Sequence, residues 1–228
     1  MNNAKFYPTL PAIRQQWIIP ALFWSTLLCS PMLWADTLTD IAPLQHGWAK
    51  VNYQISEDER EKAFAALLNE ADAVVAAHPG EAEPLIWRGI IKSSYAGVKG
   101  GLGALSVAES SKVDFEAALA ANAEALQGSA YTSLGVLYAK VPGWPIGFGS
   151  DKKAKQLLEK ALTINPQGID PNYFYAEFLL ENRDYKGAMR YLELAKAAPT
   201  RPGREDADAG RQLDITLLEQ RLQKKLKK

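Results

Sequence analysis

The sequence has very little of the side-chain chemistry on which enzymes and metal sites rely. Its 228 residues contain one cysteine, Cys29, and two histidines, His46 and His78. One cysteine cannot form a disulfide within the chain, and the two histidines do not have the spacing of metal ligands. A Gly-x-Ser-x-Gly nucleophile elbow is missing as well. We therefore expect a protein that is not an enzyme and that holds no metal and no cofactor.

The chain also lacks an excess of charge of either sign. It has 26 Lys and Arg residues against 26 Asp and Glu residues, so its formal net charge is zero. Nucleic-acid-binding proteins need a basic excess for the phosphates, and we expect no nucleic-acid partner. Charges are interspersed except at the C-terminal end, in Lys224, Lys225, Lys227 and Lys228. These cations suit the end of a helix, and contact with a membrane surface or an acidic partner is the alternative.

The only long apolar run lies near the N-terminus, at residues 17–34. The charges before it, Lys5 and Arg14, are both positive, and the small residue Ala35 follows it. This order is typical of a secretory signal with cleavage after Ala35. We therefore expect residues 1–35 to be a signal peptide and the protein to be exported. An uncleaved membrane anchor is the second interpretation, although the run is at the lower length limit for a membrane span.

The apolar pattern beyond residue 56 is helical, and it repeats. Three positions recur at a spacing of 34 residues, since Ala154, Leu158 and Ala161 return as Ala188, Leu192 and Ala195. This spacing is the length of one tetratricopeptide helix–turn–helix unit. No useful stretch has the alternating pattern of a strand. We predict an all-α, tetratricopeptide-like solenoid of helical hairpins over residues 56–228, with capping helices at its N- and C-terminal ends.

Turn and cap residues divide this region into helices. We expect a polar lead-in segment at 36–55 and then a capping helix at 56–78. A degenerate first repeat follows, with one helix from Pro84, another from near Leu105 and a glycine-rich insertion at 97–103 between them. The remaining helices are predicted at 129–140, 150–164, 170–181, 185–198 and 205–226, the last of them as the C-terminal cap.

Two sets of motifs carry a family resemblance. Tyr131, Leu134, Gly135 and Tyr138, followed by the small-residue pattern from Ala154, resemble a tetratricopeptide repeat, and so do residues 172–199. More narrowly, the chain resembles the T-component family of TRAP transporters. That likeness rests on the exported layout, the loop Pro142-Gly143-Trp144-Pro145 with Phe148-Gly149, and residues 168–175.

The narrower resemblance implies a periplasmic repeat protein that accompanies the substrate-binding protein of an organic-acid uptake system. Members of that family are often lipoproteins. The residues directly before Cys29 are Thr26, Leu27 and Leu28, which lack the small residue that a lipoprotein signal places there. Lipid tethering is therefore not expected for this chain.

Repeats of this type line a concave groove with set positions of the first helix of each unit. Carried onto this chain, the resemblance implies a groove formed by Ile86, Ile90, Ser93, Ser94, Thr132, Val136, Ala139, Lys140, Tyr173, Glu177, Leu180 and Glu181. The set is an apolar strip with polar groups toward one end, and it suits an extended apolar peptide or an elongated small apolar ligand. Glu177 and Glu181 lie one helical turn apart, either as a solvated face or as a site for a cationic group.

The loop at residues 141–149 is longer than an ordinary repeat requires. Its prolines and glycines favour a defined path, and long ordered insertions are often functional. Trp144, Pro145 and Phe148 are the candidate contact residues. One interpretation is that the aromatic residues fold back onto the repeat, and the other is that they form a wall over the groove or an oligomer contact.

These patterns predict an exported, non-catalytic binding protein with a protein partner. The first hypothesis is a periplasmic accessory of a TRAP-type uptake system that docks a solute-binding protein and holds an elongated apolar ligand. The alternative is a general periplasmic scaffold for envelope assembly or secretion. Exposed aromatic residues also make a homo-oligomer an expectation of the sequence.

Overall fold

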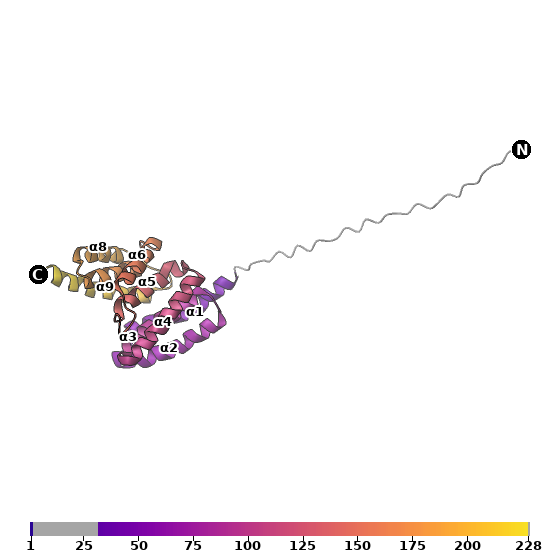
Figure 1. The fold of residues 1–228 in the computed structure, drawn as a ribbon, viewed down its shortest axis with the longest axis horizontal. Coiled ribbons are helices and arrows are strands. Elements are labelled where there is room, and N and C mark those ends of the chain that lie inside the picture. The colour runs from indigo at the N-terminus through magenta and orange to yellow at the C-terminus, as the bar shows by residue number, and fades with distance from the viewer. Residues whose placement is uncertain (2–31, 228) are drawn as a thin grey trace. The chain divides into compact units, whose positions relative to one another are not determined.

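Consecutive helices pair along the chain as antiparallel hairpins (Figure 1). The computed structural model describes residue 1 and residues 32–227, so most of the predicted signal peptide lies outside the described residues. Within them no β-strand occurs, and the predicted all-α hairpin fold is confirmed. The helices are α1 (Met32–Tyr53), α2 (Glu57–Ala77), α3 (Ala82–Lys99), α4 (Gly101–Ala121), α5 (Ala125–Lys140), α6 (Asp151–Ile164), α7 (Ile169–Glu181), α8 (Tyr185–Lys196) and α9 (Glu205–Leu226).

Small residues set how closely the two helices of a hairpin approach. Gly135 of α5 faces Leu158 of α6, and a Cβ atom at Gly135 would lie 2.8 Å from Leu158 Cγ. Gly89 of α3 faces Phe115 of α4 in the same way, at 2.6 Å from Phe115 Cε1. The alanines of the 34-residue pattern are fully buried, as helix backbones in close contact require.

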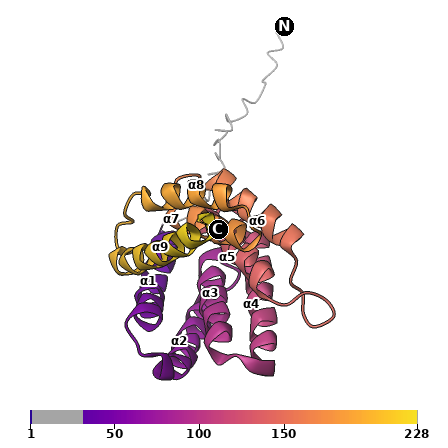
Figure 2. The same ribbon diagram turned by 90° about the vertical axis from the view of Figure 1, so that its left-hand side faces the viewer.

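The inner helices of the solenoid form a closed ring. Contacts run from α1 to α3, from α3 to α5, from α5 to α7 and from α7 to α9, and α9 also contacts α1. Figure 2 shows α9 beside α1 at its first turns and lying along the α7–α8 hairpin. An open solenoid presents its inner helices as a concave surface, whereas here the last helix returns to the first.

The segment at 36–55, expected to be a polar lead-in, is largely helical. Most of it belongs to α1, which packs on α2, α3 and α9, so the helix at 57–77 is not the first helix of the folded body. Pro43 and Gly47 disfavour a helix and obscured the pattern. The buried stripe nevertheless has helical spacing: Ile41, Leu44, Trp48 and Val51.

The glycine-rich stretch at 97–103 is not an insertion loop. Helix α3 continues to Lys99 and α4 begins at Gly101, so only Gly100 separates them. Gly100 has φ +61°, a backbone conformation that glycine adopts without steric cost. The additional residues therefore lengthen the hairpin instead of interrupting it.

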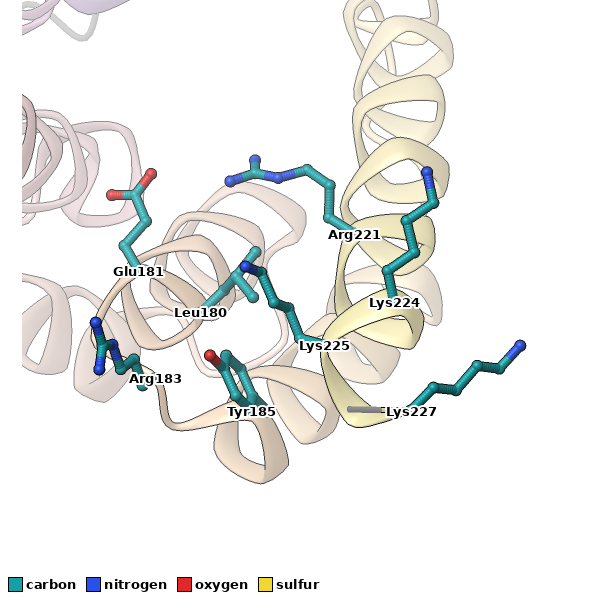
Figure 3. A pocket seen from close by; sticks show the side chains of 8 residues that line it. All are labelled: Leu180, Glu181, Arg183, Tyr185, Arg221, Lys224, Lys225 and Lys227. Atoms are coloured by element: carbon teal, nitrogen blue, oxygen red, sulfur yellow. The ribbon is translucent and has the colours of Figure 1, made fainter.

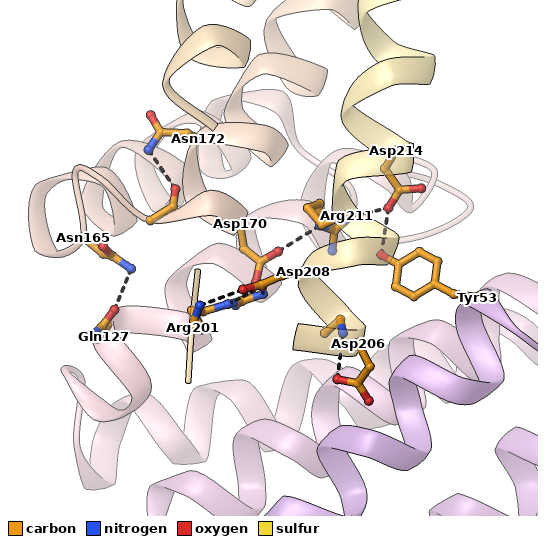
Figure 4. Close-up of polar contacts among 12 residues, drawn as sticks. Tyr53, Gln127, Asn165, Asp170, Asn172, Arg201, Asp206, Asp208, Arg211 and Asp214 are labelled. Carbon is orange, nitrogen blue, oxygen red and sulfur yellow. Dashed lines mark hydrogen bonds and ion pairs between the residues drawn. The ribbon is translucent and has the colours of Figure 1, made fainter. Parts of the chain in front are cut away.

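Ring closure rests on a network of partly buried charges around Arg211 of α9 (Figure 4). Arg211 donates to Asp170 at the start of α7 (2.9 Å) and to Asp214 of α9 (2.9 Å). Asp214 also accepts a hydrogen bond from the Tyr53 hydroxyl of α1 (2.8 Å). Arg201, in the segment before α9, donates to the other oxygen of Asp170 (2.6 Å). The network thus joins α1, α7 and α9.

Burial and charge act in opposite directions on Asp170. Burial alone would raise the pKa of its carboxyl, but Arg211 and Arg201 outweigh that effect and hold the pKa well below its usual range. Burial raises the pKa of the Tyr53 hydroxyl, so this group stays protonated and able to donate. Gly210 of α9 packs directly on the Tyr53 ring and leaves no room there for a Cβ atom.

We expect Gly135→Leu to lower the free energy of unfolding by about 3 kcal/mol or more, because a larger side chain would force α5 and α6 apart. The clash involves the Leu158 backbone nitrogen at 3.2 Å as well as its side chain. Gly97→Leu is the matched control, since no atom lies within 4 Å of a Cβ at that helical position. Urea unfolding of both variants measures the difference. Equal stability of the two would contradict the packing described here.

We expect Asp170→Asn to lower the free energy of unfolding at pH 7 by about 2 kcal/mol, because two guanidinium groups lose a charged acceptor. Since the folded-state pKa of Asp170 is lowered, its contribution is fully present above the unfolded-state pKa of about 4 and is lost as pH falls below it. The difference in the free energy of unfolding between variant and wild type, measured by chemical unfolding, should therefore become smaller at acid pH. Asp72→Asn, at an exposed pair with Arg88, is the control. A difference in the free energy of unfolding that stays constant with pH would contradict the stabilising role of the ionised Asp170.

Candidate functional site

The structure places the predicted groove residues in two different environments. Ile86, Thr132, Tyr173 and Leu180 are buried, and the partly buried Ile90 and Val136 pack against the hydrophobic core. Packing between neighbouring helices accounts for this burial, since Ile86 lies in a core cluster with Ala118 of α4 and Ala130 of α5, and α9 covers Tyr173. The Arg211 guanidinium, for example, covers the Tyr173 ring at 4.6 Å from its centroid. These side chains pack against their neighbours, and of the four buried ones Leu180 and Tyr173 also line cavities beside α9.

The polar residues at the other end of the predicted groove come together on the surface. Lys140 Nζ lies 2.7 Å from Glu181 Oε1 and 3.1 Å from Glu177 Oε2. Burial opposes the charge on Lys140, but Glu177 and Glu181 outweigh it and raise the pKa of Lys140. Arg221 of α9 approaches Glu177 at 3.9 Å. The two carboxylates are therefore paired with cations of the chain itself.

Two neighbouring cavities lie between the α7–α8 hairpin and the C-terminal half of α9. The larger has a volume of about 710 Å³ and includes Leu180 and Glu181 in its lining (Figure 3). The smaller, of about 370 Å³, includes Tyr173, and both are lined by Arg221 and Lys224. Sequence reasoning identified one side of these cavities. It missed Arg183, Tyr185 and the α9 residues, for which the terminal lysine run was the available signal.

The loop after α5 presents apolar side chains on a well-fixed base. Trp144 is 90% exposed and Ile146 is 70% exposed, and Pro145 is exposed between them. Phe148 instead folds back, with its ring edge-on to Tyr138 at 5.4 Å between centroids. The Gly149 amide donates to the Pro142 carbonyl (2.9 Å) and the Ser150 amide to the Tyr138 carbonyl (2.9 Å). Phe148 therefore folds back onto the repeat, whereas a wall over the groove or an oligomer contact stays a prediction for Trp144 and Pro145.

The histidines act as structural ties between helices. His78, at the end of α2, pairs with Asp40 of α1 at 2.8 Å, and this hydrogen bond raises the pKa of His78. His46 of α1 pairs with Asp206 of α9 at 2.9 Å. In the part of the chain that the structure describes, no three His, Cys, Asp or Glu side chains are grouped to hold a metal ion. Nor is any helix there long and apolar enough to cross a membrane.

Residues 152–202 match the family model of the tetratricopeptide repeat. This match covers the helices α6, α7 and α8, so the chain carries a tetratricopeptide repeat there, and the general resemblance is confirmed for this part. A comparison with curated proteins gives no match. Stacked helical repeats of this kind serve as binding surfaces, which makes interaction with a protein the class of function that the fold supports.

The two aromatic residues of the loop should respond differently to truncation. We expect Phe148→Ala to destabilise the loop by about 1 kcal/mol through loss of the aromatic pair with Tyr138. Trp144→Ala should change stability by less than about 0.5 kcal/mol because the side chain is exposed. Hydrogen exchange of the Gly149 and Ser150 amides is the measurement. Faster exchange in Trp144→Ala than in Phe148→Ala would contradict this division.

Proposed function

We propose that this protein is an exported, non-catalytic adaptor that binds a protein partner, and that the partner is the solute-binding protein of a TRAP-type uptake system. The tetratricopeptide match supports the general part of this proposal. The T-component resemblance of the loop and of residues 168–175 supports the specific part. A general envelope scaffold is the alternative function, since the same fold serves both roles.

The observation that carries the proposal is the exposed tip of the loop, Trp144-Pro145-Ile146. Large apolar side chains that project into water favour a contact with a partner. The base of the loop is hydrogen-bonded and packed through Phe148, so the tip is held in place before binding. A preformed contact loses less conformational entropy on association. The loop is also part of the motif on which the T-component resemblance rests.

An elongated apolar ligand is not part of this proposal. Such a ligand would need access to the apolar positions of the predicted groove. Ile86 lies in a core cluster with Ala118 and Ala130, and Thr132 is 5% exposed. Binding at Ile86 would require α3 to separate from α4 and α5. A protein partner at the loop needs no such rearrangement.

Export is proposed through residues 1–35. N-terminal sequencing of the protein recovered from the envelope fraction is expected to begin at Asp36. A chain that keeps residue 1 and sediments with membranes would support the uncleaved anchor instead. Recovery of the protein in the cytoplasmic fraction alone would contradict export in either form.

Affinity capture from an envelope extract tests the partner. We expect the tagged protein to retain a solute-binding protein, identified by mass spectrometry. The double variant Trp144→Ala, Ile146→Ala should reduce its recovery at least about tenfold, as loss of a central aromatic anchor does at many interfaces. The matched control is Leu194→Ala, Leu213→Ala, which removes two exposed apolar side chains from α8 and α9.

Each result of this capture separates the hypotheses. Loss of the solute-binding protein from the loop variant alone supports the proposal. Capture of other envelope proteins, with no solute-binding protein among them, favours the general scaffold. Equal loss in the loop variant and the control would show that the loop is not the contact. Size-exclusion chromatography with light scattering of the same samples tests the homo-oligomer, which should dissociate in the loop variant if the tip joins two copies.

A further inference from the structure

We propose that the larger cavity between the α7–α8 hairpin and α9 is a binding site for an acidic, extended segment of a protein partner. It is called the basic cleft below, and it is lined by Leu180, Glu181, Arg183, Tyr185, Arg221 and the lysines of α9. This inference rests on the cleft alone and is independent of the proposed role in solute uptake. It concerns a surface other than the loop with Trp144.

Positive charge predominates in the basic cleft although the chain as a whole has no net charge. Five cations, Arg183, Arg221, Lys224, Lys225 and Lys227, line it together with a single carboxylate, that of Glu181. Glu181 is already paired with Lys140 at 2.7 Å, so it does not neutralise the cleft. In the described part of the chain, Arg183 and the three lysines take part in no ion pair. An anionic partner would supply the missing charge.

The cations are placed to hold an extended ligand between two elements. Figure 3 shows Arg183 on the α7–α8 turn, with Arg221 and Lys225 reaching from α9 toward Leu180. Tyr185 lies between the two sides and Lys227 points away. Leu180 and Tyr185 give the cleft apolar and aromatic surface between the charges. This arrangement fits a segment that alternates carboxylates with an apolar or aromatic side chain.

The backbone at Arg183 is a second observation. Arg183 has φ +66°, in the left-handed region that favours glycine and costs other residues about 1 kcal/mol. Its side chain is exposed and forms no hydrogen bond or ion pair in the structure. An arginine therefore occupies a turn position at which glycine would adopt the same backbone conformation at a lower energetic cost. A gain in stability does not explain an arginine at this position, whereas binding of an anion does.

A protein segment fits the basic cleft better than a membrane or a nucleic acid. A lipid surface is broad and would contact a convex or flat basic face, whereas these residues line a concavity of about 710 Å³. Nucleic acids need a longer basic track, and the chain has no net positive charge. A segment of a few residues matches both the size of the cleft and its mixture of charge and apolar surface.

The test uses protein purified in the form recovered from cells and a fluorescein-labelled peptide, Asp-Glu-Phe-Glu-Asp. We expect saturable binding by fluorescence anisotropy that weakens as salt rises toward about 0.15 M. The uncharged peptide Asn-Gln-Phe-Gln-Asn and the basic peptide Lys-Lys-Phe-Lys-Lys should not bind. Phosphatidylglycerol vesicles test the membrane alternative in the same buffer. Vesicle binding without peptide binding, or no binding of the acidic peptide at low salt, would overturn the proposal.

Two cleft variants and two controls locate the site. Arg183→Gly and Lys225→Glu should each weaken peptide binding about tenfold, as loss of a charge-assisted contact does. Lys50→Glu and Lys152→Glu change charge at exposed positions without ion pairs, on α1 and α6, and should change affinity less than about twofold. Arg183→Gly should also keep or raise the thermal midpoint, because it relieves the left-handed backbone. Equal affinity of the cleft variants and the wild type would refute the proposed site.

Discussion

The contact between Arg211 and Asp170 is the interaction on which the arrangement of the helices depends. A partly buried charged pair is stable only when its remaining hydrogen-bonding groups are satisfied. Here Arg201, Asp214 and the Tyr53 hydroxyl supply those partners. Because the members come from α1, α7, α9 and the segment before α9, the network closes only when all these elements are in place. It therefore fixes where the last helix lies, which hydrophobic packing alone specifies less strictly.

Closure of the ring changes which surfaces are free to bind. In an open solenoid the inner helices offer their side chains to a ligand. In this chain α9 packs on α1 and α7 and covers Tyr173, while Ile86 is buried among residues of α3, α4 and α5. We therefore propose that binding takes place at features outside the ring. The loop tip at Trp144 and the basic cleft beside α9 are two such features, and each stands on an element held by its own packing.

Sequence patterns predicted the hairpins well where small residues and turns recur. The 34-residue spacing identified α5 to α8 because the close approach of helices demands glycine or alanine at fixed positions. The pattern failed at 36–55, where Pro43 and Gly47 hide a helix stabilised by tertiary packing. The sequence pattern also does not reveal that α9 packs against α1. That contact depends on residues far apart in the chain, such as Tyr53 and Gly210, and no local period records it.

Helix α9 shows why the candidate sites were the hardest part to predict. Its first turn carries Glu205, Asp206 and Asp208, and its last turn carries Lys224 and Lys225. Both groups of charges interact favourably with the helix dipole. From the sequence alone, each group is therefore interpreted as stabilising the helix. Among the residues that the structure describes, Asp208 binds Arg201, while Lys224 and Lys225 form no ion pair. The helix dipole favours the acidic residues of the first turn and the basic residues of the last turn equally. Within the described residues, however, only the acidic end forms ion pairs with other parts of the protein. The basic end, which lines the basic cleft together with Arg183, is the part that we propose pairs with an acidic segment of a partner.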